Sequence, residues 1–459
     1  MWKNYIKIGC RNLYKNKVYT LINVIGLAVG LACCLLIFLF VKDELSFDKF
    51  QKNRDRIYRI VYHATNGYDF ARVPIPIQPL LQDNFSEIES SARVYSRNLS
   101  VHIDQNNGMK SSYEEENVLF ADSTINDILT FEILAGNPEK FFRDPYTVVL
   151  SESSQRKYFG SEDALGKTII INGKIPLQVV GIVADYPSQS HLEFSMILPF
   201  DDMFKIEEDK MEQIMRENLA MNWVISHSYT YVLLKEGYDA RGVNDGFAAL
   251  VKNNAPEQLQ VGQSFSLEPM TDWHLHSDSA VLFKPNSDIR YIQTFSAIAL
   301  ITLIIACFNF INLSTANSSK RTREVGLRKV LGARRDQLFS QFMGEAVIIS
   351  SVAFLLALLI TSLALPQLNQ ITNKTMALSP AMVGGTGLLV FFILFLITGI
   401  LGGSYPSFIL TQINVINSLQ GQTNNKTQKG INLRKVLVTI QFTLSIALIA
   451  AAILVYNQL

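Results

Sequence analysis

The sequence predicts an α-helical membrane bundle of five spans, with a large α+β extracytoplasmic domain between the first and second spans. Two observations predict this fold. Five segments of the 459-residue chain are long and apolar enough to cross a bilayer, and none contains Asp, Glu, Lys or Arg. Residues 42–291 hold 24 basic and 37 acidic side chains, whereas the remainder holds 17 basic and 3 acidic ones. The net charge of +1 therefore conceals an acidic domain joined to a basic, apolar remainder.

Each predicted span has about the 20 apolar residues that a helix needs to cross a bilayer core of about 30 Å. The absence of charge fits the cost of roughly 2.5–3.5 kcal/mol for one charge at the centre of a span. The five spans are predicted at residues 18–41, 292–313, 346–365, 383–401 and 436–456.

Basic residues gather at one end of these spans. Residues 1–17, the segment 314–345 and the linker 402–435 carry five, seven and four Lys or Arg side chains. All three lie on one side if the spans alternate, and the positive-inside rule places that side in the cytoplasm. We therefore expect a cytoplasmic N-terminus, an extracytoplasmic domain at 42–291 and a short outside loop at 366–382.

The first 17 residues have the pattern of an amphipathic helix that lies on the inner membrane surface. Lys3, Lys7, Arg11 and Lys15 recur every four residues, with apolar side chains between them. Such a helix would contact membrane lipid. The alternative is a basic flank that only sets topology.

The acidic domain combines strand and helix patterns. Residues 55–62 alternate as a strand does, and residues 169–180 predict a hairpin around Asn172-Gly173, a pair that suits a type I′ turn. Pro176 predicts that its strand lies near an edge or bulge. Residues 152–159 and 211–219 are expected to be helical, so the domain is α+β with two subdomains. It contains no cysteine, because Cys10, Cys33, Cys34 and Cys307 all lie outside it, where small buried apolar residues are expected.

A short internal repeat suggests a second half. Asn12-Leu13-x-Lys15 before the first span is echoed by Asn432-Leu433-x-Lys435 before the fifth. We expect the fifth span to begin a second half-repeat and the chain to be a fragment of a protein built from two such halves.

No motif predicts catalysis or a cofactor. The segment 160–168 resembles a P-loop but has five residues between Gly160 and Gly166-Lys167, where four are needed, so it predicts a turn before a strand. His274-x-His276 and the acidic stretch 201–209 could begin a cation site. No Cys accompanies them and no carboxylate stands out as a further ligand, so no metal is expected.

The segment after the second span is more informative. Glu324 stands four residues before Arg328, the favourable order for a helix ion pair, and Gly332 permits a break between two helices. One apolar face is predicted, which a purely topological flank would not need; its members are Leu327, Val330, Leu331, Leu338 and Phe342. Such a face could lie on lipid headgroups or on a partner protein.

This segment resembles the FtsX-like permease domain. The resemblance is carried by the run from Arg323 to Ala333, by Asn309 and Asn312 before it, and by Gln341-Phe342-x-x-Glu345 after it. The outside domain is similar to the MacB-type periplasmic domain. Its matching motifs are Phe47-Asp48-Lys49-Phe50, Tyr58-Arg59, Val148-Val149-Leu150-Ser151, Tyr158-Phe159-Gly160, Val179-Val180-Gly181-Ile182 and Pro187-x-x-Ser190-His191.

The resemblance implies a permease subunit of an ABC transporter in the bacterial inner membrane. In that family, ATPase-driven motion is transmitted to the outside domain (mechanotransmission), here for export or extraction of a substrate. The chain would be non-catalytic and need no cofactor, because a separate cytoplasmic nucleotide-binding ATPase subunit uses the ATP. A dimer or pseudo-dimer of two permease halves is implied, and no nucleic acid.

The resemblance places the ATPase contact in the coupling segment 314–345. Its residues are Arg323, Glu324, Gly326, Leu327, Arg328, Lys329, Leu331, Gly332 and Ala333. Small residues would allow close helix packing, and amides could bond across helices, together with Gln441. These packing residues are Gly26, Gly30, Asn309, Asn312, Gly399 and Gly403.

Two other classes of function stay open at this stage. A membrane-anchored regulator or receptor could activate an extracytoplasmic enzyme, such as a cell-wall hydrolase, without moving cargo. A secondary transporter fits less well, because no ionisable residue lies inside any predicted span.

Overall fold

The computed structural model describes residues 11, 13–104, 110–206, 209–260, 262–280, 282–320, 322–411 and 425–458. The chain forms two compact units, Met1–Leu45 with Arg290–Leu459 and Ser46–Ile289. We call them the membrane unit and the sheet unit. The predicted domain 42–291 corresponds to the sheet unit, which begins at Ser46. The difference arises because residues 42–44 still belong to the first long helix. Of the predicted surface helix 1–17, only residue 11 and residues 13–17 are described.

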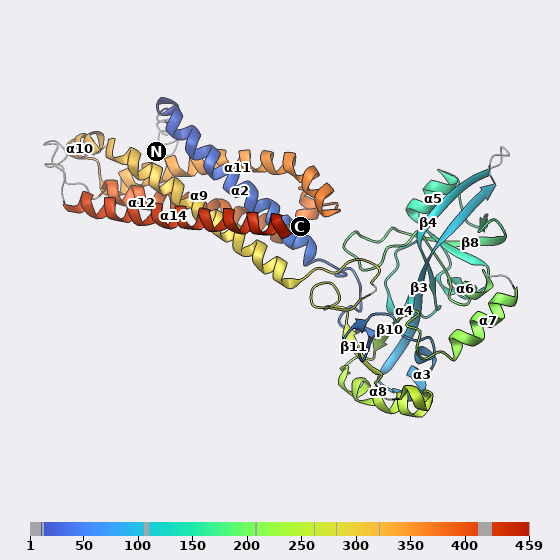
Figure 1. Cartoon of the computed structure of the whole chain (residues 1–459). Coiled ribbons are helices and arrows are strands. Elements are labelled where there is room, and N and C mark those ends of the chain that lie inside the picture. The colour runs from blue at the N-terminus through green and yellow to red at the C-terminus, as the bar shows by residue number, and fades with distance from the viewer. Residues whose placement is uncertain are drawn as a thin grey trace. The chain divides into compact units, whose positions relative to one another are not determined.

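The membrane unit is made of helices (Figure 1). They are α2 (Lys17–Glu44), α9 (Ile289–Lys320), α10 (Thr322–Val330), α11 (Arg335–Thr372), α12 (Pro380–Thr411) and α14 (Asn425–Gln458). In the described part of the chain, four helical segments are long and apolar enough to cross a membrane: Lys17–Glu44, Ile289–Asn317, Arg335–Thr372 and Val383–Ser404. They correspond to the first four predicted spans. The fifth span stays a prediction, since the described apolar part of α14 is the shorter stretch Lys435–Ala450.

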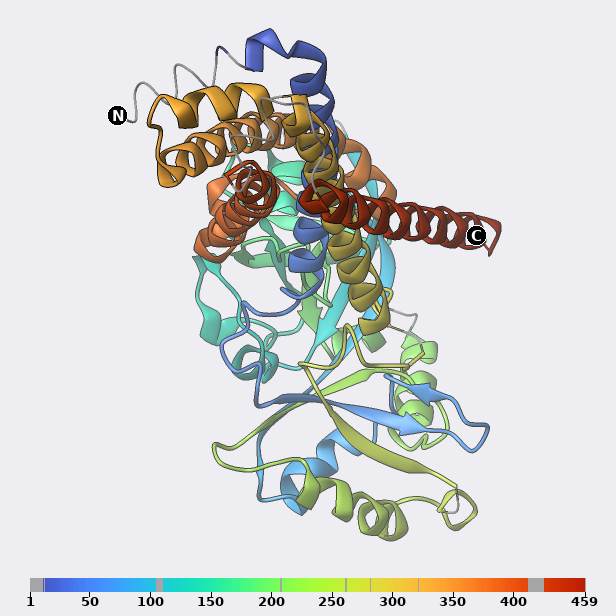
Figure 2. The ribbon, with the colours of Figure 1, turned by 90° about the vertical axis from the view of Figure 1, so that its left-hand side faces the viewer.

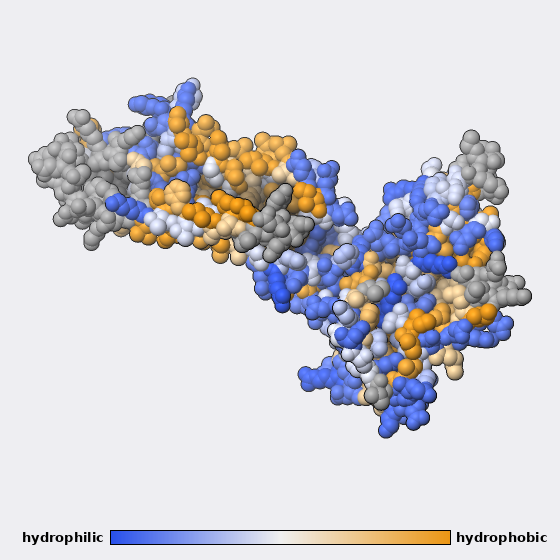
Figure 3. Space-filling view, in the orientation of Figure 1, coloured by the Kyte–Doolittle hydropathy of each residue, from blue (hydrophilic) through white to orange (hydrophobic). Residues whose placement is uncertain are grey.

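A continuous apolar core joins α2, α9, α11 and α12. Small side chains at its centre, such as Ala28, Ala353 and Ala357, are fully buried and let the helix backbones approach closely. Outside this core the same helices carry exposed Leu, Ile and Phe side chains, and Figure 3 shows hydrophobic residues along the unit. A surface of this kind suits contact with lipid.

The sheet unit contains eleven strands among its described residues, in the order β11-β1-β10-β3-β4-β9-β6-β8-β5. β2 pairs with β1, and β7 pairs with β3 and β8. The strands are β1 (Ile57–His63), β2 (Asp69–Phe70), β3 (Ile88–Asp104), β4 (Lys110–Ala121), β5 (Ile133–Gly136), β6 (Thr147–Ser151), β7 (Thr168–Ile171), β8 (Ile175–Val183), β9 (Met196–Pro199), β10 (Tyr229–Leu234) and β11 (Ser264–Pro269). In Figure 2 the blue β1 lies beside the yellow-green β11, its antiparallel neighbour.

Short helices cover this sheet. They are α3 (Ile77–Asn84), α4 (Ile125–Ile128), α5 (Glu152–Phe159), α6 (Asp202–Lys205), α7 (Asp209–Ala220) and α8 (Arg241–Asn254), with 3₁₀ turns at Pro138–Lys140 and Glu257–Leu259. One apolar core lies between α3, α8 and the strands β1, β10 and β11. Another gathers α5 and α6 with β7, β8 and β9. The long strands β3 and β4 run between these two regions (Figure 1).

The local predictions for this unit are confirmed. The strand, the hairpin β7–β8 and both helices form, and Asn172 and Gly173 have φ of 49° and 69°, as a type I′ turn requires. Pro176 is exposed and pairs with Ile170, in the part of β8 that precedes its pairing with β6. Its missing N–H is tolerated there because no second strand needs a donor.

Candidate functional site

The segment between α9 and α11 contains a short helix that ends in a defined turn. Gly332 has a φ of +92°, a left-handed conformation that glycine adopts at little cost. Its amide donates to the Lys329 carbonyl at 3.1 Å, and the Ala333 amide donates to the Arg328 carbonyl at 2.9 Å. These two bonds form a Schellman motif, which ends a helix by satisfying its last carbonyls. The break predicted at Gly332 is therefore present.

A small apolar core holds α10 against the start of α11. Val325, Leu338 and Phe342 are 1%, 2% and 9% exposed, and Ala333 packs against them. Because Ala333 follows the glycine turn directly, the turn and the core fix the angle between the two helices together. We call this arrangement of α10, the turn and the first two turns of α11 the elbow.

The predicted ion pair between Glu324 and Arg328 is confirmed. The Arg328 guanidinium donates to Glu324 Oε1 at 2.6 Å and to Gln341 Oε1 at 2.8 Å. The Gln341 contact links α10 to α11 a second time, beside the apolar core. With 33% and 46% of the charged side chains exposed, the ion pair itself is worth only about 0.2–1 kcal/mol.

The prediction of one continuous apolar face is wrong. Leu338 and Phe342 are buried, but Leu327, Val330 and Leu331 are 52%, 61% and 84% exposed. The reason is the turn at Gly332, which brings α11 back against the Val325 side of α10. Leu327, Val330 and Leu331 lie about 140–240° around the helix from Val325 at 3.6 residues per turn. They therefore form a separate, outward apolar face.

Charged side chains of both signs lie near this face, since Arg334 pairs with Asp336 and Arg328 pairs with Glu324. Arg334 is 77% exposed, and Lys329 and Arg335 lie close enough for their charges to interact. Partial burial, and then the charge of Arg335, lower the pKa of Lys329 below its usual range. Gly326 is buried, and the side chain of Arg323 lies outside the described residues. An exposed apolar surface with a charged rim can bind a partner that has an apolar groove.

Three of the predicted packing glycines, Gly26, Gly30 and Gly403, lie where helices approach closely. A Cβ on Gly30 would stand 2.6 Å from the Ala306 Cβ, and one on Gly26 would stand 3.0 Å from the Asn309 Nδ2. These contacts join α2 to α9. Gly403 approaches Ala346 of α11 in the same way, at 2.6 Å.

Other packing predictions have weaker or different counterparts. A Cβ on Gly399 would meet nothing closer than Ser350 at 3.6 Å, which is an ordinary contact. Gly402, which the sequence analysis missed, is tighter, since its Cβ would lie 1.9 Å from Phe310 Cδ1. Asn312 donates to Gln441 of α14 across a long 3.5 Å.

A charged cluster that sequence reasoning missed fastens the other end of α11. Lys374, two residues beyond α11, pairs with Asp43 and, at 2.7 Å, with Glu44, the last residues of α2. The three side chains are only 15%, 7% and 5% exposed. The neighbouring Lys42 donates to the Val383 carbonyl of α12 at 2.7 Å. A signal existed in the sequence, because Lys374 is the only charged residue of the loop 366–382.

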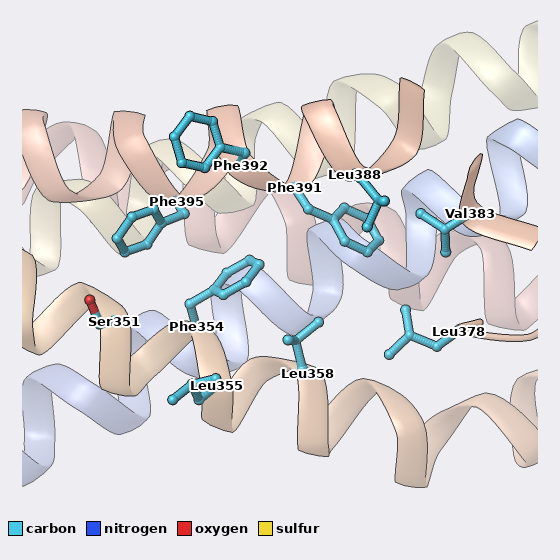
Figure 4. A pocket seen from close by; sticks show the side chains of 10 residues that line it. All are labelled: Ser351, Phe354, Leu355, Leu358, Leu378, Val383, Leu388, Phe391, Phe392 and Phe395. Carbon is cyan, nitrogen blue, oxygen red and sulfur yellow. The ribbon is translucent and has the colours of Figure 1, made fainter. Parts of the chain in front are cut away.

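A groove of about 520 Å³ lies between α11 and α12 (Figure 4). Ser351 is its single polar lining residue, and aromatic rings of both helices, among them Phe354 and Phe391, face it. Its chemistry is that of the lipid-facing surface of a span, and it offers no charged group to a polar ligand.

The remaining candidates from the sequence make contacts that are typical of structural residues. His274 stacks on Phe47, while His276 is half exposed. Among the described residues, no group of three or more His, Cys, Asp or Glu side chains could hold a metal ion. Asp202, in the acidic stretch, is buried and accepts from the Tyr146 amide at 2.7 Å. The segment 160–168 is a turn before β7, as predicted.

Comparison with known proteins identifies the family. The family model described as MacB-like periplasmic core domain matches residues 20–250, half of the chain. The one described as FtsX-like permease C-terminal matches residues 296–415. The chain therefore belongs to the family of ABC transporter permeases with MacB-like and FtsX-like domains, and it is a multi-pass inner-membrane protein.

Named relatives are distant and longer. "Macrolide export ATP-binding/permease protein MacB 1" of Yersinia pestis bv. Antiqua (strain Antiqua) is 22% identical over 437 residues, which cover 91% of this chain and 60% of the relative. "Macrolide export ATP-binding/permease protein MacB" of Neisseria gonorrhoeae is 27% identical over 286 residues, covering 60% of this chain and 38% of the relative. The chain thus spans less than two thirds of these relatives. The crystal structure of the periplasmic region of MacB from Actinobacillus actinomycetemcomitans is similar at a TM-score of 0.34 and 16% identity, covering 47% of this chain and 90% of that structure.

Proposed function

We propose that this chain is the transmembrane subunit of a MacB/FtsX-type ABC transporter and transmits ATPase-driven motion to an extracytoplasmic sheet unit. The chain itself is non-catalytic, and a separate nucleotide-binding subunit in the cytoplasm hydrolyses ATP. That subunit binds the elbow through Leu327, Val330 and Leu331.

The outward apolar face formed by these three residues is the observation that carries the proposal. Leu327 and Val330 on this nine-residue helix, and Leu331 directly after it, remain 52–84% exposed, while the opposite side of the helix is fastened by its own core. Such a patch with a polar rim is typical of a protein contact. The fixed angle at the elbow lets a push on α10 move α11 as well, since the two helices cannot rotate independently.

α11 provides the path from the elbow to the other end of the bundle. Its 38 residues extend about 57 Å at 1.5 Å per residue, nearly twice the thickness of a bilayer core. Beyond its far end, Lys374 pairs with Asp43 and Glu44 of α2. The chain enters the sheet unit at Ser46, two residues after Glu44. A displacement of α11 is therefore carried to the point where the chain leaves the membrane unit.

The ATPase contact is tested by replacing one exposed leucine. Leu331→Ser should reduce co-purification with the cognate nucleotide-binding subunit by about tenfold, since an exposed leucine in an apolar contact contributes on the order of 1–3 kcal/mol. Leu355→Ser is the matched control, because Leu355 is 66% exposed on a predicted span. Equal co-purification of the Leu331 variant and wild type would refute the contact.

The proposed orientation has its own test. With the N-terminus inside and residues 42–291 outside, a reporter fused near residue 330 is active only in the cytoplasm. Extracytoplasmic activity at this position would rule out an ATPase at the elbow, whatever the binding experiment gave.

The transport direction is proposed from the named relatives, which are macrolide exporters. We propose export or extraction of a substrate. ATP-dependent release of a labelled cargo from cells would support it. Activation of an extracytoplasmic enzyme with no cargo released would instead indicate a regulator.

A further inference from the structure

Both chain connections of the sheet unit are attached to one short segment of that unit. The chain enters at Ser46, and the Phe47 ring stacks on His274 with ring centroids 3.5 Å apart and planes at 4°. The chain leaves at Ile289, whose amide donates to the Leu275 carbonyl at 3.1 Å. The Ser287 amide donates to the His274 carbonyl at 2.9 Å. The segments by which the chain enters and leaves the unit thus meet at residues 274–275.

Asp48, the next residue along the entry, is held in an unusual conformation. Its φ is +53°, a left-handed value that is uncommon for a residue with a side chain. Its carboxylate oxygen Oδ1 accepts from His191 Nδ1 at 2.9 Å, the His191 amide at 3.2 Å and the Ser190 hydroxyl at 3.1 Å. The side chain is 4% exposed. These contacts hold the strained backbone in place.

The charge state of Asp48 keeps this arrangement intact. Burial alone would raise the pKa of Asp48. The charge of His191 and the hydrogen bonds from His191 and Ser190 outweigh burial and lower the pKa below its usual range. The carboxylate is therefore ionised at neutral pH and accepts all three hydrogen bonds.

His191 connects Asp48 to the centre of the sheet unit. Its Nε2 forms a hydrogen bond of 3.1 Å with the Tyr231 hydroxyl, which stays protonated because burial raises its pKa. The imidazole ring also meets the Trp273 ring edge to face, at 4.7 Å between centroids. Tyr231 belongs to β10, so the entry of the chain is tied to a central strand.

Trp273 is fixed in turn to two further strands. Its indole N–H donates to the Glu268 carbonyl of β11 at 2.9 Å, and the ring is 1% exposed. Arg59 of β1 lies over that ring at 5.2 Å and donates to the Glu268 carboxylate at 2.7 Å. A cavity of only 20 Å³ remains between Phe47, His191 and His274, enough for one water molecule at most.

We propose that Phe47, Asp48, His191, Trp273 and His274 form a joint that holds the entry and exit of the sheet unit together and passes motion of α2 into strands β1, β10 and β11. We call this arrangement the root joint. Its role in transmitting motion rests on the proposed function. Its existence as a closed unit is tested separately. His191 and His274 act here by holding other residues in position. His274 is the first histidine of the His274-x-His276 motif.

The first experiment measures amide hydrogen exchange in the full chain in detergent, without any ATPase. Asp48→Asn and His274→Ala should each increase exchange at residues 46–50 and 286–290 by about tenfold or more, because local opening then exposes both connections. The pairing of β3 with β4 should be unaffected. Two variants at different positions keep the test valid if one of them does not fold.

His276→Ala is the matched control, since His276 belongs to the same segment and type but has a side chain 51% exposed. Its exchange should stay within about twofold of wild type. The root joint is overturned if His274→Ala and Asp48→Asn leave both connections unchanged, or if His276→Ala opens them to the same extent.

The second experiment measures transmission in membranes that contain the cognate nucleotide-binding subunit. His274→Ala should retain co-purification but lose most ATP-dependent change in exchange at β1 and β11. Unaltered ATP-dependent change would overturn the role in transmission. If wild type binds no ATPase at all, the proposed function fails, while the first experiment still decides the joint.

Discussion

At the scale of single residues, buried charged side chains hold the end of α2. Asp43 and Glu44 are 7% and 5% exposed at the end of α2, and the ammonium group of Lys374 compensates both. Breaking a buried ion pair by removing one partner leaves an uncompensated charge, which is much costlier than removing the whole group. This asymmetry makes the cluster testable.

Lys374→Met should destabilise the membrane unit by about 3–5 kcal/mol, because two buried carboxylates lose their partner. The triple variant Lys374→Met, Asp43→Asn, Glu44→Gln should recover much of that loss. The thermal midpoint of the full chain in detergent measures both. A triple variant less stable than the single one would show that Lys374 acts by something other than its charge.

His227 gives the sheet unit a defined response to acid. Burial, followed by the charges of Arg72 and Arg93, lowers the pKa of His227 to about 4. The unfolded value is about 6.5, so the unfolded chain binds more protons between these two values. Stability should therefore fall as the pH drops from about 6.5 to about 4, by at most about 1.4 kcal/mol per unit.

His227→Asn should flatten this part of the profile, whereas His276→Asn, at an exposed position, should leave it unchanged. Thermal midpoints of the full chain between about pH 7 and about pH 4 provide the comparison. Identical slopes in wild type and His227→Asn would contradict the assignment.

At the scale of elements, helix contacts depend on where two backbones approach. Gly30→Ala would place a methyl group 2.6 Å from the Ala306 Cβ, so α2 and α9 would have to separate. We expect a loss of about 1–3 kcal/mol, typical of overpacking. Gly399→Ala, with its nearest neighbour at 3.6 Å, should be neutral or slightly stabilising. Thermal midpoints that change equally would show that neither glycine sets the helix distance.

The elements themselves show what local sequence can predict. The hairpin at Asn172-Gly173 and the Glu324–Arg328 pair were predictable, because both depend on residues within a few positions. The inward face of α10 was not, because it depends on the direction in which the Gly332 turn sends α11. Lys374 was missed for a related reason, since its partner Asp43 is 331 residues away.

At the scale of the whole molecule, the first four spans followed from hydrophobicity alone, which needs no knowledge of contacts. The sheet order did not, because β10 lies between β1 and β3, and β4 and β9 pair in parallel across long stretches of chain. Sequence therefore predicted the four described helices that are long and apolar enough to cross a membrane, and the α+β class of the other unit. It could not predict the root joint, whose members come from three separate segments, 47–48, 191 and 273–274.

The central claim is that the outward face of α10 contacts a cytoplasmic ATPase. A photo-crosslinking amino acid at position 331 tests it most directly, with position 355 as the lipid-facing control. We predict that position 331 crosslinks to the nucleotide-binding subunit in intact cells and that position 355 does not. A crosslink at position 355 alone, or none to that subunit from position 331, would contradict the account.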